Sequence, residues 1–168
     1  ITFGGTLGSL RLRGKSSMGT ALYSGDGCST IKFSTATSPV DCTGDIRTLI
    51  DYENYADVNT AYAGFRYLFY QNKELRTAPQ LPAKTLADLC YSGMFSGCSS
   101  LTTAPELPAK TLVDGCYDRM FFRCTSLTTA PELPAKTLAE YCYQKMFSDC
   151  TALTTAPELL AETLAESC

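Results

Sequence analysis

LTTAPELPAKTL, the stretch Leu101–Leu112, recurs letter for letter at residues 127–138. Looser copies begin at Leu75 and Leu153, so the period is 26 residues. A period of this length is typical of chains that stack short structural units, because one unit alone cannot bury its apolar face. The sequence therefore predicts an array of stacked repeats over residues 75–168.

Each copy predicts a short strand, a turn bounded by prolines and a helix. The strand is Leu-Thr-Thr-Ala in most copies, and Pro105 and its equivalents end it because proline has no amide to donate. The helix is expected to begin at pairs such as Thr85 and Asp88, which have the spacing of a capping box. The predicted fold class is therefore α/β, a right-handed leucine-rich-repeat solenoid of strand-turn-helix repeats with a parallel sheet.

Apolar side chains in residues 139–150 recur at i, i+3, i+4, i+7, i+8 and i+11, which is typical of one face of an α-helix. Cysteines occupy two columns of this stripe, and we interpret them as small buried hydrophobic residues. Disulfides along a column and metal binding are the alternatives. The cysteines concerned are Cys90, Cys98, Cys116, Cys124, Cys142, Cys150 and Cys168.

The chain is expected to divide into three parts. Residues 1–51 are rich in Gly, Ser and Thr with short β-prone runs, and they predict a small β-rich domain or cap. Residues 52–74 predict a degenerate half-repeat. The array then comprises residues 75–100, 101–126, 127–152 and a truncated copy, 153–168. Because that copy stops before its Tyr-x-x-Met-Phe segment, we expect the natural chain to continue there or this end to pack on another chain.

Two features of the first part carry their own interpretations. Ser24-Gly25-Asp26-Gly27 is a turn signal without the lysine and helix of a phosphate loop. Cys28 and Cys42 lie outside the repeat, and a disulfide between them and two free thiols are both open interpretations.

Composition excludes several classes of function. The net charge of -3 argues against a general nucleic-acid role, which would need a basic face. No apolar run of about 18 residues occurs, so no membrane span is predicted. The chain has no histidine, which excludes Ser-His-Asp and Cys-His mechanisms and the usual zinc sites that contain histidine. We predict no cofactor and no metal.

The segment MFSGCSSLTTAPELPAKTL, Met94–Leu112, resembles the BspA-type (Treponema-type) leucine-rich repeats of surface proteins from Bacteroidetes and other host-associated microbes. Its Phe-x-x-Cys-x-x-Leu core stands at Phe95, Cys98 and Leu101, and the resemblance covers roughly residues 64–168. It implies a secreted or cell-surface bacterial adhesin that recognises a host or microbial surface protein or a glycan. The family has no shared catalytic site, so the resemblance implies that the chain is not an enzyme.

One face of the repeat changes while the strand and turn stay the same. It comprises positions 88, 89, 92, 93, 96 and 97 and their equivalents. Arg119, Phe122 and Arg123 place an aromatic residue between two arginines, a composition that suits a binding hot spot, and Tyr141 and Lys145 follow in the next copy. We predict these five as binding residues, with neutral drift of solvated positions as the alternative. A second candidate face carries Thr102, Thr103, Thr128 and Thr129.

The sequence thus favours a non-catalytic extracellular binding or adhesion module. The second hypothesis is a structural or assembly protein that stacks through its uncapped C-terminal repeat. The third, a carboxylate-based glycan hydrolase, is the weakest, because the repeat itself generates the charged columns, which we interpret as solvated surface. These columns are Glu106, Glu132 and Glu158, and Lys84, Lys110 and Lys136.

Overall fold

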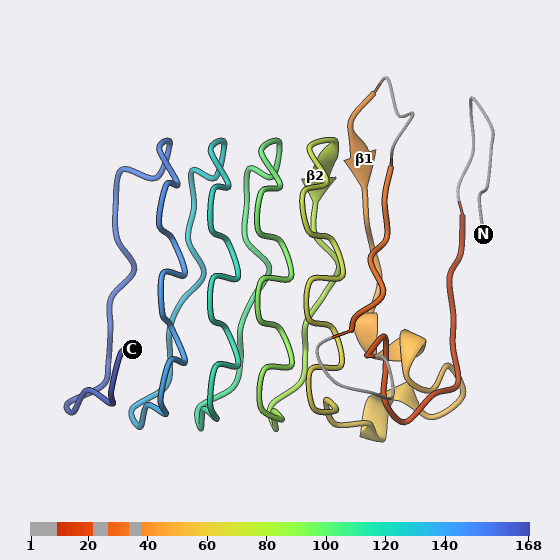
Figure 1. Ribbon diagram of the computed structural model, residues 1–168, viewed down its shortest axis with the longest axis horizontal. Coiled ribbons are helices and arrows are strands. Elements are labelled where there is room, and N and C mark those ends of the chain that lie inside the picture. Colours follow the sequence, from red (N-terminus) through yellow and green to blue (C-terminus); the bar gives the residue numbers. More distant parts are fainter. Residues whose placement is uncertain (1–9, 22–26, 34–37) are drawn as a thin grey trace.

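The computed structural model describes residues 10–21, 27–33 and 38–168, and it shows a stack of coils whose long axis follows the direction of stacking (Figure 1). We number the coils by their residues: coil 1 is 38–74, coil 2 is 75–100, coil 3 is 101–126 and coil 4 is 127–152. Few residues in the described part belong to regular elements. They are β1 Val40–Asp41, the 3-10 helices η1 Ile46–Leu49 and η2 Tyr55–Asp57, and β2 Leu75–Thr77.

The predicted leucine-rich-repeat solenoid of strand, turn and helix is wrong. Within the described ranges the only sheet is the parallel pair β1 and β2, and no α-helix occurs. Thr85 and Asp88 precede a run of turns where the capping-box spacing predicted a helix. In the predicted strand of coil 3 a single residue is paired: Thr103 makes two parallel bridges, one with Thr77 and one with Thr129.

A ribbon of successive turns replaces the predicted helix in every coil. In coil 2 the amide of Cys90 donates to Ala87 three residues back, and every second amide up to Cys98 follows the same rule. The amides between them donate across to coil 3. Gly93 N–H, for example, bonds the carbonyl of Asp118 at 2.7 Å. Half of the amides are therefore satisfied within the coil and half by the next coil, whereas an α-helix satisfies all of its interior amides internally.

Positive φ angles at every fourth residue bend the ribbon away from a helical path. Gly93 and Gly97 have φ of 59° and 78°, in the left-handed region that glycine adopts without steric cost. Other coils place side chains at equivalent positions, such as Arg119 at φ 49° and Lys145 at φ 51°. A residue with a Cβ in this region costs roughly 1–3 kcal/mol, so the surrounding bonds must hold it there.

The core runs along the stack as columns of identical side chains. The Phe95 ring stacks on the equivalent rings of both neighbouring coils, with centroids 5.6 and 5.7 Å apart and interplanar angles of 5° and 6°. Tyr91 stacks on Tyr117 in a second column at 6.0 Å. Met94, Cys98 and Leu101 are fully buried beside them. Burying each large apolar side chain contributes roughly 1.5–3 kcal/mol, and only stacked coils can do so.

The N-terminal segments lie against the first edge of the stack. Val40 in β1 pairs with Leu75 in β2, so on the strand side these two coils are offset by 35 residues, against 26 between later coils. The segments before β1 supply donors to the outer carbonyls of coil 1: Thr20 N–H bonds Gly64 O at 2.6 Å, and Ile31 N–H bonds Leu68 O at 2.7 Å. They thereby cover the carbonyl edge of the first turn ribbon. The turn predicted at residues 24–27 lies largely outside the described residues.

Candidate functional site

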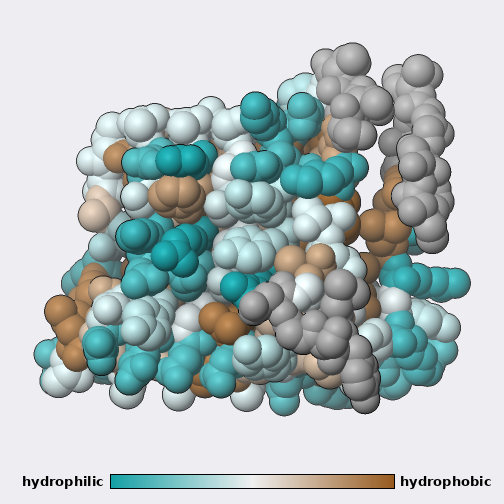
Figure 2. Space-filling model, viewed as in Figure 1, coloured by the Kyte–Doolittle hydropathy of each residue, from teal (hydrophilic) through white to brown (hydrophobic). Residues whose placement is uncertain are grey.

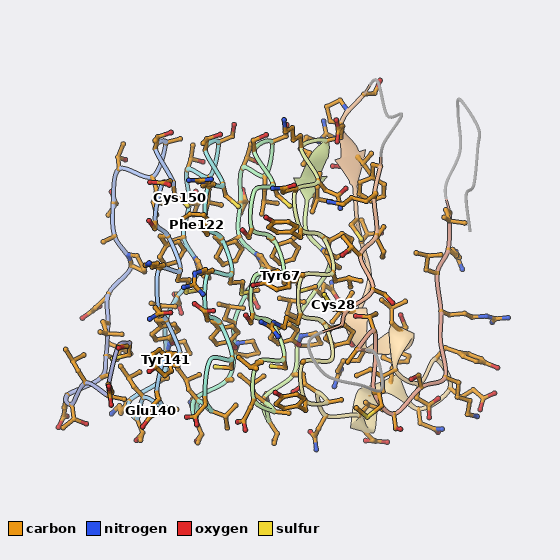
Figure 3. All side chains as sticks on the ribbon, in the orientation of Figure 1. Cys28, Tyr67, Phe122, Glu140, Tyr141 and Cys150 are labelled. Atoms are coloured by element: carbon orange, nitrogen blue, oxygen red, sulfur yellow. The ribbon has the colours of Figure 1, made fainter. Side chains whose placement is uncertain are left out.

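The outward side chains of the turn ribbon form a regular grid. Each turn presents the positive-φ residue and the residue before it to the outside. Figure 3 shows Tyr67 of coil 1 and Phe122 of coil 3 on this same side of the stack. The grid positions of coil 1 are Arg66, Tyr67, Tyr70 and Gln71, and those of coil 2 are Ser92, Gly93, Ser96 and Gly97. Those of coil 3 are Asp118, Arg119, Phe122 and Arg123, and those of coil 4 are Gln144, Lys145, Ser148 and Asp149.

All five predicted binding residues belong to turn ribbons of neighbouring coils. Arg119, Phe122 and Arg123 lie together on coil 3, and Lys145 is the equivalent of Arg119 on coil 4. Tyr141 begins the ribbon of coil 4, with 40% of its surface exposed. The outward positions are not uniformly solvated as the helical interpretation implied, because Ser92 and Ser96 of coil 2 are buried.

The arginines of coil 3 are held by specific partners. The guanidinium of Arg123 lies over the Phe122 ring, 4.8 Å from its centroid, and Nε of Arg123 bonds Asp149 Oδ2 at 3.2 Å. Arg119 donates to Asp118 Oδ2 at 2.9 Å. The side chain of Arg123 is 66% exposed, so its ion pair contributes at most about 1 kcal/mol and an external anion can compete for it.

Asp118 is a buried carboxylate in the middle of the grid. Only 8% of the residue is exposed, and its Oδ1 has no hydrogen-bond partner in the described part of the chain. Oδ2 receives Arg119 and, at 3.5 Å, the hydroxyl of Ser92. Burial raises the pKa of Asp118, and the neighbouring guanidinium of Arg119 opposes that shift. The negative charge of Asp118 is therefore costly to bury and is offset mainly by Arg119.

An aromatic group on coil 1 belongs to the same face and was not predicted. A Cβ at Gly93 would lie 2.0 Å from Cε1 of Tyr67, so the Tyr67 ring lies over this glycine. The ring makes an edge contact with Tyr70 at 5.4 Å, and the guanidinium of Arg66 lies 5.1 Å from its centroid. The glycines at 93 and 97 were the available signal, because they remove side chains where other coils have them. The helical interpretation gave no reason to connect Gly93 with a residue 26 positions earlier.

We call this surface the recognition strip. It mixes charged, polar and aromatic side chains, and Figure 2 shows teal and white atoms over most of the face with isolated brown patches. Two cavities lie away from this surface, one beside Arg47 and Lys84 and the other beside Lys15 and Ile50. The strip comprises Arg66, Tyr67, Tyr70, Gln71, Asp118, Arg119, Phe122, Arg123, Tyr141, Lys145 and Asp149.

The other predicted surfaces lie outside the strip. Thr102 and Thr103 are exposed on the strand side, as are their equivalents Thr128 and Thr129. The glutamate column and the lysine column are also exposed, and no ion pair joins them within the described residues. Glu106 and Lys110 illustrate both columns in coil 3.

The array cysteines are core residues, as predicted. Six of them are buried, and the Sγ of Cys98, Cys124 and Cys150 each donates to a phenylalanine carbonyl of the preceding coil at 3.0–3.1 Å. Burial raises the pKa of Cys90 and Cys98 to about 12, which keeps these thiols protonated near neutral pH.

Two cysteines lie outside the repeat, and the metal-binding alternative for the cysteines can be compared with the described residues. Cys28 and Cys42 are half-buried free thiols. In residues 10–21, 27–33 and 38–168, no group of three cysteine, aspartate or glutamate side chains is arranged to hold a metal ion. The same residues include no helix both long and apolar enough to cross a bilayer.

Comparison with family models, with curated proteins and with solved structures finds no match to this chain. The resemblance to BspA-type repeats therefore stays a prediction.

Proposed function

We propose that this chain is a non-catalytic binding module that recognises its partner through the recognition strip. The observation that carries the proposal is the contrast between coils at equivalent backbone positions. Coil 2 has Gly93 and Gly97 where coil 3 has Arg119 and Arg123, yet both ribbons make the same bonds. Backbone hydrogen bonds fix the path of the ribbon. Its outward side chains can therefore differ between coils without changing the fold, and their identities can suit a binding partner.

The composition of the strip supports the same role. Arginine and aromatic residues are enriched in the few positions that dominate binding energy. Arg123 stacked on Phe122 is such a pair, and its side chain remains largely exposed. We place the module outside the cell or on its surface, with a surface protein or glycan as partner. The buried thiols of the array, with their raised pKa values, suit that oxidising setting because they react slowly.

The test is binding of the chain to an array of matrix proteins and glycans, beside a variant with Arg119→Ser, Phe122→Ser and Arg123→Asp. We expect saturable binding to at least one partner and its loss in the variant. A matched variant, Thr102→Ser with Thr128→Ser, alters the other face and should bind like the parent chain. Binding that survives the triple change would move the site off the recognition strip and contradict the proposal.

A further inference from the structure

The recognition strip is a cationic surface on an acidic protein. The whole chain has a net charge of -3, yet the arginines and lysine of the strip outnumber its two carboxylates. One of those carboxylates, Asp118, is buried and already engaged by Arg119. Lys32 adds a further cation over the Tyr70 ring, 5.4 Å from its centroid. The local excess of positive charge favours an anionic partner.

Two guanidinium groups of the strip are stacked on aromatic rings. Arg66 lies over Tyr67 at 5.1 Å, and Arg123 lies over Phe122 at 4.8 Å. A guanidinium over an aromatic ring loses less freedom when it binds, and its planar N–H groups can make two parallel bonds to a carboxylate or a sulfate. The exposed Arg123 is the better placed of the two for an external ligand, because its present partner, Asp149, is itself exposed.

Polar and aromatic groups alternate closely along the strip. Gln71 donates to the hydroxyl of Tyr70 at 3.0 Å, and Tyr70 is 36% exposed. A carbohydrate combines apolar C–H faces for such rings with many hydroxyls for such polar groups on one ring, whereas an acidic peptide places its anions on flexible side chains. Aromatic rings carry negative faces that attract polarised C–H groups. The strip extends from coil 1 to coil 4, so the surface suits an extended chain more than a small enclosed ligand.

The stacking distance gives the direction in which such a chain would lie. Rings in equivalent positions of successive coils are 5.6–6.0 Å apart, a spacing comparable with one pyranose unit. Along the stack the strip presents Arg66 on coil 1, small residues on coil 2, Arg119 on coil 3 and Lys145 on coil 4. A chain parallel to the long axis in Figure 1 would meet these cations in turn.

Building on the proposed binding function, we propose that the recognition strip binds an acidic carbohydrate chain that carries carboxylate or sulfate groups. The guanidinium groups bind the anions, and the tyrosine and phenylalanine rings pack against the sugar faces. Binding runs along the stack across coils 1–4, and it weakens as salt screens the charged contacts.

Titration calorimetry with four probes tests this proposal: chondroitin sulfate, polygalacturonate, neutral dextran and poly-L-glutamate. We expect saturable binding of at least one acidic glycan, none of dextran, and binding of poly-L-glutamate at least tenfold weaker. Chondroitin sulfate carries both carboxylates and sulfates and polygalacturonate carries carboxylates alone, so equal binding would show that carboxylates suffice and tighter binding of chondroitin sulfate would show that sulfate contributes. Arg119→Ser with Arg123→Ser should weaken binding by about tenfold or more, because each change removes a charge-assisted hydrogen bond to the anion.

The matched control removes two equal charges away from the strip, through Lys84→Ser with Lys110→Ser on the exposed lysine column. It should bind as tightly as the parent chain. If another partner from the matrix array binds through the strip while neither acidic glycan binds, the carbohydrate proposal is wrong and the binding function stands. Glycan binding that both double variants weaken equally would instead show general charge attraction and overturn both. Equal binding of poly-L-glutamate would overturn the carbohydrate assignment alone.

Discussion

The strand side and the turn ribbon of each coil keep their shape in different ways. The strand side repeats LTTAPELPAKTL almost without change, but few backbone bonds cross it: Thr128 N–H to Thr102 O at 3.0 Å is one, and Ala104 N–H to Thr129 O at 3.3 Å is another. The ribbon of coil 2 sends every second amide across, at 2.7–3.1 Å, while its outward residues differ from those of coil 3. Where backbone bonds determine the path, outward side chains are free to vary.

Breaking the core beneath the ribbon has the largest expected effect. Phe95→Ala removes a fully buried ring from the middle of its stack and leaves a cavity, so it should lower the free energy of unfolding by about 3–5 kcal/mol. Urea unfolding measures the change. Tyr62→Ala, at a residue that is 57% exposed, is the control and should change stability by no more than about 0.5 kcal/mol. A loss below about 1 kcal/mol for Phe95→Ala would contradict the stacked core.

Gly93→Ala tests the ribbon itself. The new Cβ would clash with the Tyr67 ring and would hold a positive φ, so we expect a loss of about 1–3 kcal/mol. Gly44→Ala is a matched control, because Gly44 also has a positive φ but nothing lies within 4 Å of its added Cβ. It should cost about 1 kcal/mol. Adding Tyr67→Ala to Gly93→Ala should recover only the part of the loss caused by the clash, and no recovery would contradict the contact between these residues.

Asp118→Asn tests the energetic cost of the buried carboxylate through the pH dependence of the free energy of unfolding. Burial raises the pKa of Asp118 in the folded state, so the folded chain binds this proton more tightly than the unfolded chain does. The stability of the parent chain should therefore fall as the pH rises from the unfolded pKa, near 3.8, through the raised folded value. Unfolding measured across this range should show a shallower fall for Asp118→Asn. An unchanged pH profile would mean that Asp118 carries no such penalty.

The smallest expected effect is relief of backbone strain on the outward face. Lys145 has φ 51°, and asparagine tolerates this region better than lysine because its short polar side chain bonds locally. Lys145→Asn should therefore raise the free energy of unfolding by about 0.5 kcal/mol. The same change at exposed Lys136, which has no positive φ, is the control and should not stabilise the chain. Equal effects at both positions would argue against strain in the ribbon.

The sequence predicted the stacking but not the local backbone. The 26-residue period, the buried columns through Phe95 and Cys98, and the face that carries Arg119 and Arg123 were all readable from spacing. The helix was wrong because apolar residues at i, i+3, i+4, i+7, i+8 and i+11 fit a period of four as well as a period of 3.6 over so short a segment. Gly93 and Gly97, four residues apart, were the signal for turns that repeat every four residues.

The aromatic part of the recognition strip could not be predicted for a related reason. Tyr67 reaches Gly93 only because equivalent residues of neighbouring coils lie side by side, and in an isolated helix those two residues would not be connected. The covering of the first carbonyl edge by Thr20 and Ile31 was equally hidden, since it depends on long-range backbone bonds and not on a local pattern.

The most direct test of the central claim is the detection of scalar couplings across hydrogen bonds by NMR in the isotope-labelled chain. The ribbon predicts coupling of Gly93 nitrogen to the carbonyl carbon of Asp118, and of Met94 nitrogen to that of Tyr91. An α-helix would couple Gly93 to Leu89 and Met94 to Cys90. Alternating couplings within and between coils would confirm the turn ribbon, and couplings four residues back throughout residues 89–97 would contradict it.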